Sequence, residues 1–384
     1  MKHAYVIHEY PPDVDFQRKC VYDLLAQRHK GINVQGVHGF QRDYKPGGLR
    51  AGRILNLVWL YLLIPLYLIL QRPVWVLVGS TPPGIQMWVA FWAKLCRIPS
   101  IAWLMDYHPE IEARALEGRK TPRFFPKMLR WLDRSCHKGL AGAITLDEAM
   151  GKVFSKNNPD VPLRIHPTWN EKCPGNFPTV SPSQGKPGSQ ISLAYAGNLG
   201  SLHQLEPFGK LLDEIQALGG DIKIQLHTFG VPSNKDLQFQ RFSDEHNIRL
   251  SIHRSKTHAE LGKFLHKHKI NYGIVLLEDA AEGVASPSKF SGYIYAGVPL
   301  LYFGPQDSNA HKICIDFNAG LALPPKVIKN LYNGAAQSIL DPVTREHHQL
   351  ATAEAYRYFS SFDGESFVGM FQSLLEEHEK KHNN

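Results

Sequence analysis

Short apolar runs alternate with longer helical stretches along most of this chain. Near its beginning, Ala4–Ile7 predicts a buried strand, Phe16–His29 a helix, and Val34–Val37 a second strand. A strand, a loop and a helix in this order open a doubly wound α/β domain. Such domains bind their ligands at the carboxyl ends of the strands, so the loop 8–15 is expected at the edge of a binding site.

The alternation continues into the second half of the chain. Strands are predicted for the segments IKIQLHTFG (222–230), IRLSIH (248–253) and YGIVLL (272–277), each followed or preceded by a helical stretch. Residues 170–190 are rich in proline, glycine and serine and have little that could form a core, which is typical of a linker. The sequence therefore predicts two doubly wound domains, 1–169 and 191–350.

Composition limits the partners of these domains. The chain has 384 residues, 43% of them hydrophobic and 20% charged, which is enough for two globular domains with separate cores. Its formal net charge of +8 favours an anionic partner such as nucleic acid, anionic lipid or a phosphorylated substrate. Because basic runs with interleaved aromatic residues are missing from the sequence, nucleic acid is not expected.

The cysteines and the first residues predict the compartment. The five cysteines are scattered and form no CxxC pair, which is typical of reduced thiols in a cytosol rather than of a disulfide framework or a zinc site. The opening MKHAYVIHEYPPD reaches a charged, proline-containing loop after a few apolar residues, so a cleavable signal peptide is not expected.

The segment ILNLVWLYLLIPLYLIL, residues 54–70, is the most apolar in the chain. It is barely long enough to span a bilayer, Pro65 interrupts it, and another strand of the same domain follows it, so we do not expect it to cross a membrane. Its aromatic residues and the flanking Arg53 and Arg72 favour a helix lying in the membrane interface, which would give a peripheral membrane contact. A helix buried in the domain core is the alternative, and the sequence leaves both open.

The stretch VASPSKFSGYIYAGVPLLYFGP, residues 284–305, combines a loop, a helix start and the apolar run Leu300–Phe303, which predicts a buried strand. Pro287 and Ser288 are residue types that begin helices, and Lys289 then falls in the first turn. A helix N-terminus has partial positive charge and free amide donors, so this lysine predicts an anion site suited to a diphosphate. A solvated helix lysine is the simpler interpretation of Lys289 alone.

A glycine pair follows the first strand of the second domain. Gly197 and Gly200 in GNLG permit a tight turn and the close approach of a ligand, and a helix is expected to begin near His203. Arg254 and Lys256 follow the strand 248–253, where a ribose and phosphates are expected. A basic surface loop explains these two residues equally simply, and for Lys256 it is the favoured interpretation.

Two further loops should lie on one edge of the first domain. The strand–loop–helix–strand unit from Val74 to Glu110 places Ser80–Gly84 and Asp106–Glu110 at the carboxyl ends of its strands. There, Asp106 and His108 could bind sugar hydroxyls or transfer a proton. Asp106 could instead cap the turn that follows it.

The motifs GSTPPG (79–84), IPSIAWLMDYHPE (98–110), ITLDEAM (144–150), IHPTWN (165–170) and GNLG (197–200) occur in one order along the chain. This arrangement resembles the retaining glycosyltransferases of family four, notably the bacterial type that builds lipid-linked surface polysaccharides. The resemblance covers most of the chain. His108 departs from it, because many relatives have a tryptophan at that position.

The resemblance implies a GT-B fold, in which two doubly wound Rossmann-like domains face one another across a cleft and the C-terminal stretch 351–384 crosses back to the first domain. It also implies a nucleoside diphosphate sugar as donor and a saccharide or polyprenyl-linked acceptor at the cytoplasmic face of the membrane. No cofactor or metal is expected, since helix dipoles and basic side chains neutralise the leaving diphosphate. The catalytic candidates are Asp106, His108 and Lys289, and the donor-binding candidates are Gly197, Asn198, Leu199, Gly200, Arg254, Ser288 and Lys289.

One departure from the family concerns two glutamates, eight positions apart, that hold the transferred sugar and the ribose. The matching positions are Ala285 and Gly292. Glu278 and Glu282 lie nearby, although neither has the usual spacing. Two alternatives therefore remain open: a non-catalytic relative in a polysaccharide assembly complex, and a nucleotide-sugar epimerase.

Overall fold

The computed structural model describes residues 2–11, 16–39, 51–118, 121–170, 190–200, 202–219, 222–254, 258–326 and 328–383. All but the end residues of the predicted linker 170–190 lie outside these ranges, and so does Lys256. The chain divides into two compact units. The first contains residues 1–168, 283–286 and 362–384, and the second contains residues 169–282 and 287–361. The predicted C-terminal element 351–384 is thus shared: residues up to Ser361 belong to the second unit and those from Phe362 to the first.

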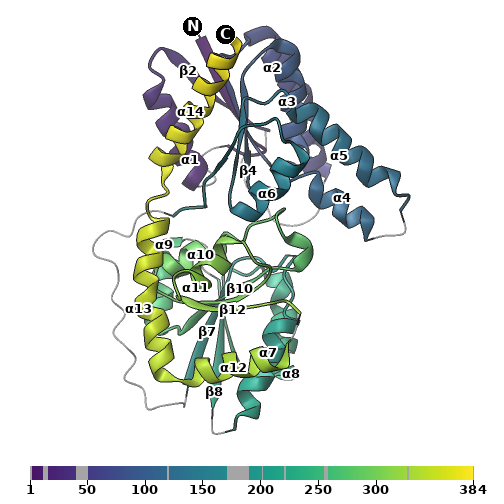
Figure 1. Cartoon of the computed structure of the whole chain (residues 1–384). Coiled ribbons are helices and arrows are strands. Elements are labelled where there is room, and N and C mark those ends of the chain that lie inside the picture. The colour runs from purple at the N-terminus through teal and green to yellow at the C-terminus, as the bar shows by residue number, and fades with distance from the viewer. Residues whose placement is uncertain are drawn as a thin grey trace. The chain divides into compact units, whose positions relative to one another are not determined.

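The first unit is built on a six-stranded parallel sheet of order β2-β1-β3-β4-β5-β6 (Figure 1). In chain order its strands are β1 Lys2–Ile7, β2 Ile32–Val37, β3 Val76–Gly79, β4 Ser100–Leu104, β5 Gly142–Thr145 and β6 Leu163–Ile165. Its helices are α1 Phe16–Arg28, α2 Ala51–Gln71, α3 Ile85–Cys96, α4 Glu110–Glu117, α5 Phe124–His137, α6 Glu148–Asn157 and α14 Gly364–Asn383.

The second unit repeats this plan with the strand order β12-β11-β10-β7-β8-β9, also parallel throughout. Its strands are β7 Gln190–Ala196, β8 Lys223–Phe229, β9 Arg249–His253, β10 Tyr272–Leu276, β11 Leu300–Phe303 and β12 Gly320–Leu323. Its α-helices are α7 Glu206–Ala217, α8 Asp236–Glu245, α9 His258–Lys267, α10 Lys289–Tyr295, α11 Asn309–Ile315, α12 Lys329–Leu340 and α13 Pro342–Phe359. The predicted class, two doubly wound parallel sheets, is confirmed.

Helix α2 shows how the sheet of the first unit holds an unusually apolar segment. Leu60, Ile64 and Leu68 are fully buried and belong to the same core cluster as the strands β1 and β3. Pro65 lies inside the helix and has no N–H to donate to the carbonyl of Tyr61, one turn earlier. The indole N–H of Trp88 on α3 donates to that carbonyl at 2.9 Å. The neighbouring helix thus satisfies the group that the proline leaves open.

The helix predicted to begin near His203 begins at Glu206 instead. Pro207 falls in its first turn, where a missing N–H costs nothing. A helix that started at His203 would bring the Pro207 ring against the carbonyl of His203, which helices do not tolerate. The strand predicted for Leu300–Phe303 agrees with the structure to the residue.

Candidate active site

Several candidate residues lie at the carboxyl-end edge of the second sheet. GNLG follows β7, Glu278 follows β10 and Arg254 follows β9. Because all six strands are parallel, these segments meet at one edge, and β7 and β10 are neighbours in the sheet. The edge therefore brings the glycine turn beside the segment that leads to Lys289.

Lys289 reaches over the GNLG turn. Its Nζ donates hydrogen bonds to the carbonyl of Asn198 at 2.8 Å and to the Tyr195 hydroxyl at 2.5 Å, and it lies 4.2 Å from the centre of the Tyr195 ring. Gly197 has φ of 83°, and a Cβ built there would lie 3.5 Å from Cε of Lys289. The positive φ favours a glycine at this turn, whereas the distance to Lys289 is an ordinary van der Waals contact that a Cβ would not disturb.

Burial changes the charge state of Lys289. Its surroundings disfavour the ammonium form and lower the pKa of Lys289 to about 7. Near neutral pH the side chain is therefore poised between its charged and neutral forms. An anion bound beside Nζ would restore the charge, because an opposite charge within a few ångströms raises a lysine pKa.

Tyr293 holds α10 against the sheet. The ladder between β7 and β10 ends at Ala194, and there the Tyr293 hydroxyl accepts from the N–H of Ala196 at 2.7 Å and donates to the carbonyl of Ala194 at 3.0 Å. Gly273 makes room for the ring, because a Cβ there would lie 2.3 Å from its Cγ. Tyr293 therefore positions Lys289. The sequence analysis missed this role, because the only sign of it in the sequence is an aromatic residue four positions after the lysine.

The GNLG turn offers fewer free amides than its sequence suggests. The N–H of Gly197 donates to the carbonyl of Phe229, and the N–H of Gly200 donates to Nδ1 of His203 at 3.0 Å. Burial and the nearby Lys289 charge lower the pKa of His203 to about 4, so its ring remains a neutral acceptor. Leu199 is buried in the core. If Leu199 contacts a sugar donor, the contact therefore comes from its backbone.

Ser288 precedes α10 but does not cap it. Its side chain makes no capping hydrogen bond, and its carbonyl instead accepts from the hydroxyl of Ser291 at 2.8 Å. Ser288 therefore begins the helix, as its residue type predicts, but its hydroxyl does not satisfy the first amides because its backbone is already helical.

Arg254 and Glu278 lie at the same sheet edge in different settings. The Arg254 guanidinium donates to the carbonyl of Val231 at 3.0 Å and pairs with Asp236, and its strand is separated from β7 by β8. The N–H of Glu278 donates to the carbonyl of Leu202 at 3.0 Å, which ties the backbone of this glutamate to the segment after the GNLG turn. The backbone of Glu278 thus lies beside the segment that follows this turn.

In the first unit, the structure places Asp106 and His108 together. The Ser80 hydroxyl accepts from the N–H groups of Met105 and Asp106 at 3.2 Å each, which joins the two predicted loops. His108 Nδ1 lies 2.6 Å from a Glu112 carboxylate oxygen. Burial raises the pKa of Asp106, which favours a carboxyl able to exchange a proton closer to neutral pH.

A buried polar network supports this loop. The Tyr107 hydroxyl donates to Asp133 at 2.5 Å and accepts from Asn158 at 3.0 Å. Glu110, 5% exposed, accepts from Nε and a terminal nitrogen of Arg130 at 2.7 and 2.8 Å. These contacts fix the backbone on both sides of His108.

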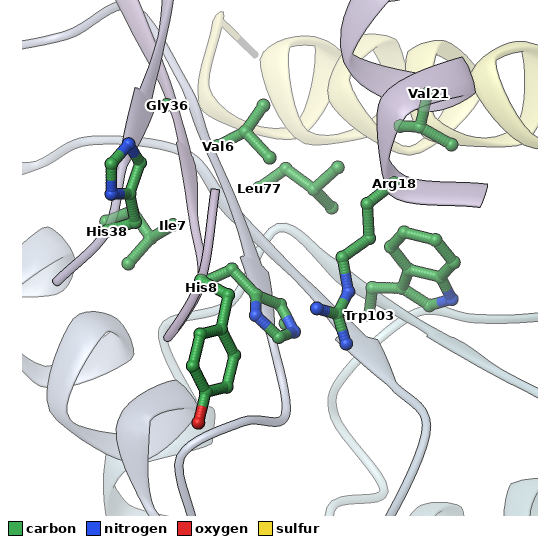
Figure 2. A pocket seen from close by; sticks show the side chains of 11 residues that line it. Val6, Ile7, His8, Arg18, Val21, Gly36, His38, Leu77 and Trp103 are labelled. Atoms are coloured by element: carbon green, nitrogen blue, oxygen red, sulfur yellow. The ribbon is translucent and has the colours of Figure 1, made fainter. Parts of the chain in front are cut away.

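A pocket of the first unit holds a histidine that the sequence did not single out. His8 follows β1, is 7% exposed, and neither of its ring nitrogens has a hydrogen-bond partner among the described residues. Figure 2 shows its imidazole beside the Arg18 guanidinium, in a pocket that Leu77 and Trp103 also line. Burial, with the Arg18 charge, holds the pKa of His8 well below its ordinary value. A Cβ at Gly79 would lie 2.4 Å from this ring, so that glycine makes room for it.

Three histidines of the second unit lie close together. His227, His253 and His268 are packed ring against ring, with centroids 4.8 to 5.5 Å apart. Among the residues that the structure describes, no three His, Cys, Asp or Glu side chains are arranged to hold a metal ion. The clustered rings are an aromatic contact rather than a ligand set.

Two parallel six-stranded sheets, each surrounded by helices, define the GT-B fold, and the chain has this fold along nearly its whole length. Among solved structures it resembles HepE from Anabaena in complex with UDP, with a TM-score of 0.59 and 11% identity over 98% of this chain and 100% of that one. It also resembles WaaG, a glycosyltransferase involved in lipopolysaccharide biosynthesis, with a TM-score of 0.61 and 13% identity over 96% and 99% of the two chains.

A point variant of TarM from S. aureus, in complex with fondaparinux, alpha-GlcNAc-glycerol and UDP, matches with a TM-score of 0.58 and 11% identity. That match covers 82% of this chain and 58% of TarM, so the chain spans little more than half the length of TarM. No protein-family model matches the sequence, and no curated protein matches it either. At these identities the likeness establishes the fold.

Proposed function

We propose that this protein is a glycosyltransferase that moves a sugar from a nucleoside diphosphate sugar, with retention, to a saccharide acceptor. The observation that carries the proposal is Lys289, held by Asn198 and Tyr195 over a glycine turn at the carboxyl-end edge of the second sheet. Solved structures with the same fold contain UDP, which supports a nucleotide donor for this chain.

Lys289 would act on the leaving diphosphate. Cleavage of the bond between sugar and diphosphate develops negative charge on the departing phosphate oxygens, and an ammonium placed there lowers the barrier without a metal ion. Tyr293 would keep Lys289 in place through its contacts with β7. Glu278 is the carboxylate we assign to the ribose, in place of the pair missing at Ala285 and Gly292.

The acceptor would bind to the first unit. Asp106, with its raised pKa, and His108 would contact acceptor or sugar hydroxyls, and the pocket around His8 offers a partly apolar subsite. The acceptor we favour is a polyprenyl-linked saccharide at the cytoplasmic face of the membrane. This choice is supported by the exposed apolar helix α2 and by the involvement of WaaG, which has the same fold, in lipopolysaccharide biosynthesis.

A ligand-dependent melting experiment tests the proposal. We expect millimolar UDP, GDP or another nucleoside diphosphate to raise the melting temperature by several degrees, because a ligand at 100 times its Kd adds about 2.7 kcal/mol. Mass spectrometry and NMR of the products then distinguish transfer with retention from epimerisation. A chain that no nucleoside diphosphate stabilises would be the non-catalytic relative that the absent glutamate pair suggests.

The pKa of Lys289 predicts how activity depends on pH. A lysine is charged below its pKa, so the cation of the free enzyme is present below about pH 7 and is lost above it. We expect kcat/KM for the donor to fall about tenfold for each pH unit above 7. In Lys289→Arg the guanidinium stays charged, so the profile should be flat to pH 9 at a lower level. An equally steep decline in that variant would show that another group titrates.

A further inference from the structure

A short stretch of the chain belongs to the first unit although its neighbours in sequence do not. Residues 283–286 are part of the first unit, whereas Glu282 before them and Pro287 after them are part of the second. We call residues 283–286 the crossing segment. Helix α10, which begins at Lys289, follows it after two residues. The crossing segment thus joins the first unit covalently to the helix that carries the proposed donor-binding lysine.

The crossing segment is bonded to the loop that holds Asp106. The N–H of Tyr107 donates to the carbonyl of Val284 at 2.7 Å, and Asp106 pairs with Ala285 in an isolated antiparallel bridge. The N–H of Asp106 donates to the Ser80 hydroxyl at 3.2 Å. The backbone around Asp106 is therefore held by two partners, and one of them is the crossing segment.

Packing fixes the start of the crossing segment. Val284 is buried and belongs to the same core cluster as Tyr107. Gly283 has φ of 68°, and a Cβ there would lie 2.7 Å from the carbonyl oxygen of Ala149 and 2.4 Å from Cγ2 of Val153. Both of those residues belong to α6. A glycine is needed at this position, because any side chain would push the segment away from α6.

After residue 286 the chain runs directly to the proposed donor site. Pro287 and Ser288 lead to Lys289, whose Nζ donates to the carbonyl of Asn198 and to the Tyr195 hydroxyl. An anion that binds beside Nζ restricts the motion of this lysine and of α10. Because two residues span at most about 7 Å and proline has a fixed φ, this restriction extends to the crossing segment.

We propose that the crossing segment is a positioning element through which a nucleoside diphosphate held at Lys289 stabilises the backbone around Asp106. The inference rests on the proposed function and extends it to the coupling between donor and acceptor. Because coupling is reciprocal, an acceptor that holds Asp106 in place strengthens donor binding by the same factor.

Hydrogen–deuterium exchange of the full-length chain, followed by mass spectrometry, tests this coupling. The N–H of Tyr107 exchanges when its bond to Val284 opens. The probe is the member of a panel of UDP, GDP, ADP, CDP and dTDP that raises the melting temperature most. We expect it to slow exchange in the peptides that contain Tyr107 by at least about threefold.

Gly283→Ala should remove the coupling without touching the donor site. The new methyl group meets the carbonyl of Ala149, so the crossing segment shifts away from Tyr107. We expect the Tyr107 amide to exchange at least about tenfold faster than in the parent. The nucleotide should leave this rate unchanged while it still raises the melting temperature. Val284→Ala loosens the packing of the same segment and should act in the same direction, which keeps the test decisive if Gly283→Ala does not fold.

Gly219→Ala is the matched control. Gly219 also has a positive φ, 80°, but a Cβ there would lie within 4 Å of no other described residue. The substitution therefore strains the backbone similarly without moving the crossing segment. The exchange of the Tyr107 amide and its response to the nucleotide should equal those of the parent.

Two results would overturn the proposal and leave the proposed function intact. One is unchanged exchange at Tyr107 in a parent protein that the nucleotide stabilises against melting. The other is equal slowing by the nucleotide in the parent and in Gly283→Ala. If no nucleotide of the panel stabilised the parent, the proposed function would fail and this inference would fail with it.

Discussion

Replacing Lys289 by alanine should lower kcat for sugar transfer by about 100- to 1,000-fold at pH 6.5, where the lysine is charged. The loss belongs mainly to kcat, because the charge on the diphosphate grows as its bond to the sugar breaks and the ammonium stabilises that growing charge more than the ground state. The measurement is steady-state kinetics with the donor that stabilises the protein in the melting experiment.

Lys312→Ala is the matched control for this prediction. Lys312 is also a helical lysine of the second unit, but it pairs with Asp316 on the surface at 2.6 Å, so its removal should leave kcat unchanged. The Lys289 variant should fold normally, since the loss removes a partly buried cation rather than a core side chain. Unchanged turnover in a folded Lys289→Ala enzyme would refute the role proposed for this residue, whatever donor is bound.

The elements that position Lys289 were largely readable from sequence because they depend on local rules. Leu300–Phe303 is a short apolar run closed by glycine and proline, and it forms β11 as predicted. The GNLG turn has the positive φ at Gly197 that a glycine after a strand suggests.

Contacts between segments that are distant in the chain could not be predicted from the sequence. Tyr293 completes the end of β7 through Ala194 and Ala196, nearly one hundred positions away, and no periodicity predicts such a pair. His203 takes up the N–H of Gly200 only because the chain turns back after the glycine. The pocket histidine His8 lies in a loop that the sequence marked as a site edge, but its burial against Gly79 comes from the pairing of β1 with β3.

Arg254 illustrates why the order of strands matters. In the sequence it follows a strand of the second unit, where a ribose and phosphates are expected, and it is therefore a candidate for phosphate binding. The sheet places its strand β9 at the edge, beyond β8, and Asp236 and the carbonyl of Val231 engage its guanidinium. Strand order depends on the packing of the whole sheet, which a local pattern does not contain. The role of Arg254 stays a prediction.

Replacing Arg130 by alanine should destabilise the first unit by about 3 kcal/mol. Glu110 is almost fully buried, and Arg130 gives it two charge-assisted hydrogen bonds, so the variant leaves a buried carboxylate with Arg114 and Asn157 as its remaining partners. Urea unfolding followed by intrinsic fluorescence measures this effect, because all seven tryptophans except Trp169 lie in the first unit.

Two further variants distinguish a buried charge from a simple loss of packing. Arg134→Ala removes an exposed arginine from the same helix and should change the free energy of unfolding by less than about 0.5 kcal/mol. Glu110→Gln in the Arg130→Ala background removes the stranded charge and should recover part of the lost stability, since a neutral amide is less costly to bury than a carboxylate. The contrary result is that Glu110→Gln lowers the stability of the Arg130→Ala variant by as much as it lowers the stability of the parent. The two residues would then act independently, and the ion pair would not hold the loop around His108.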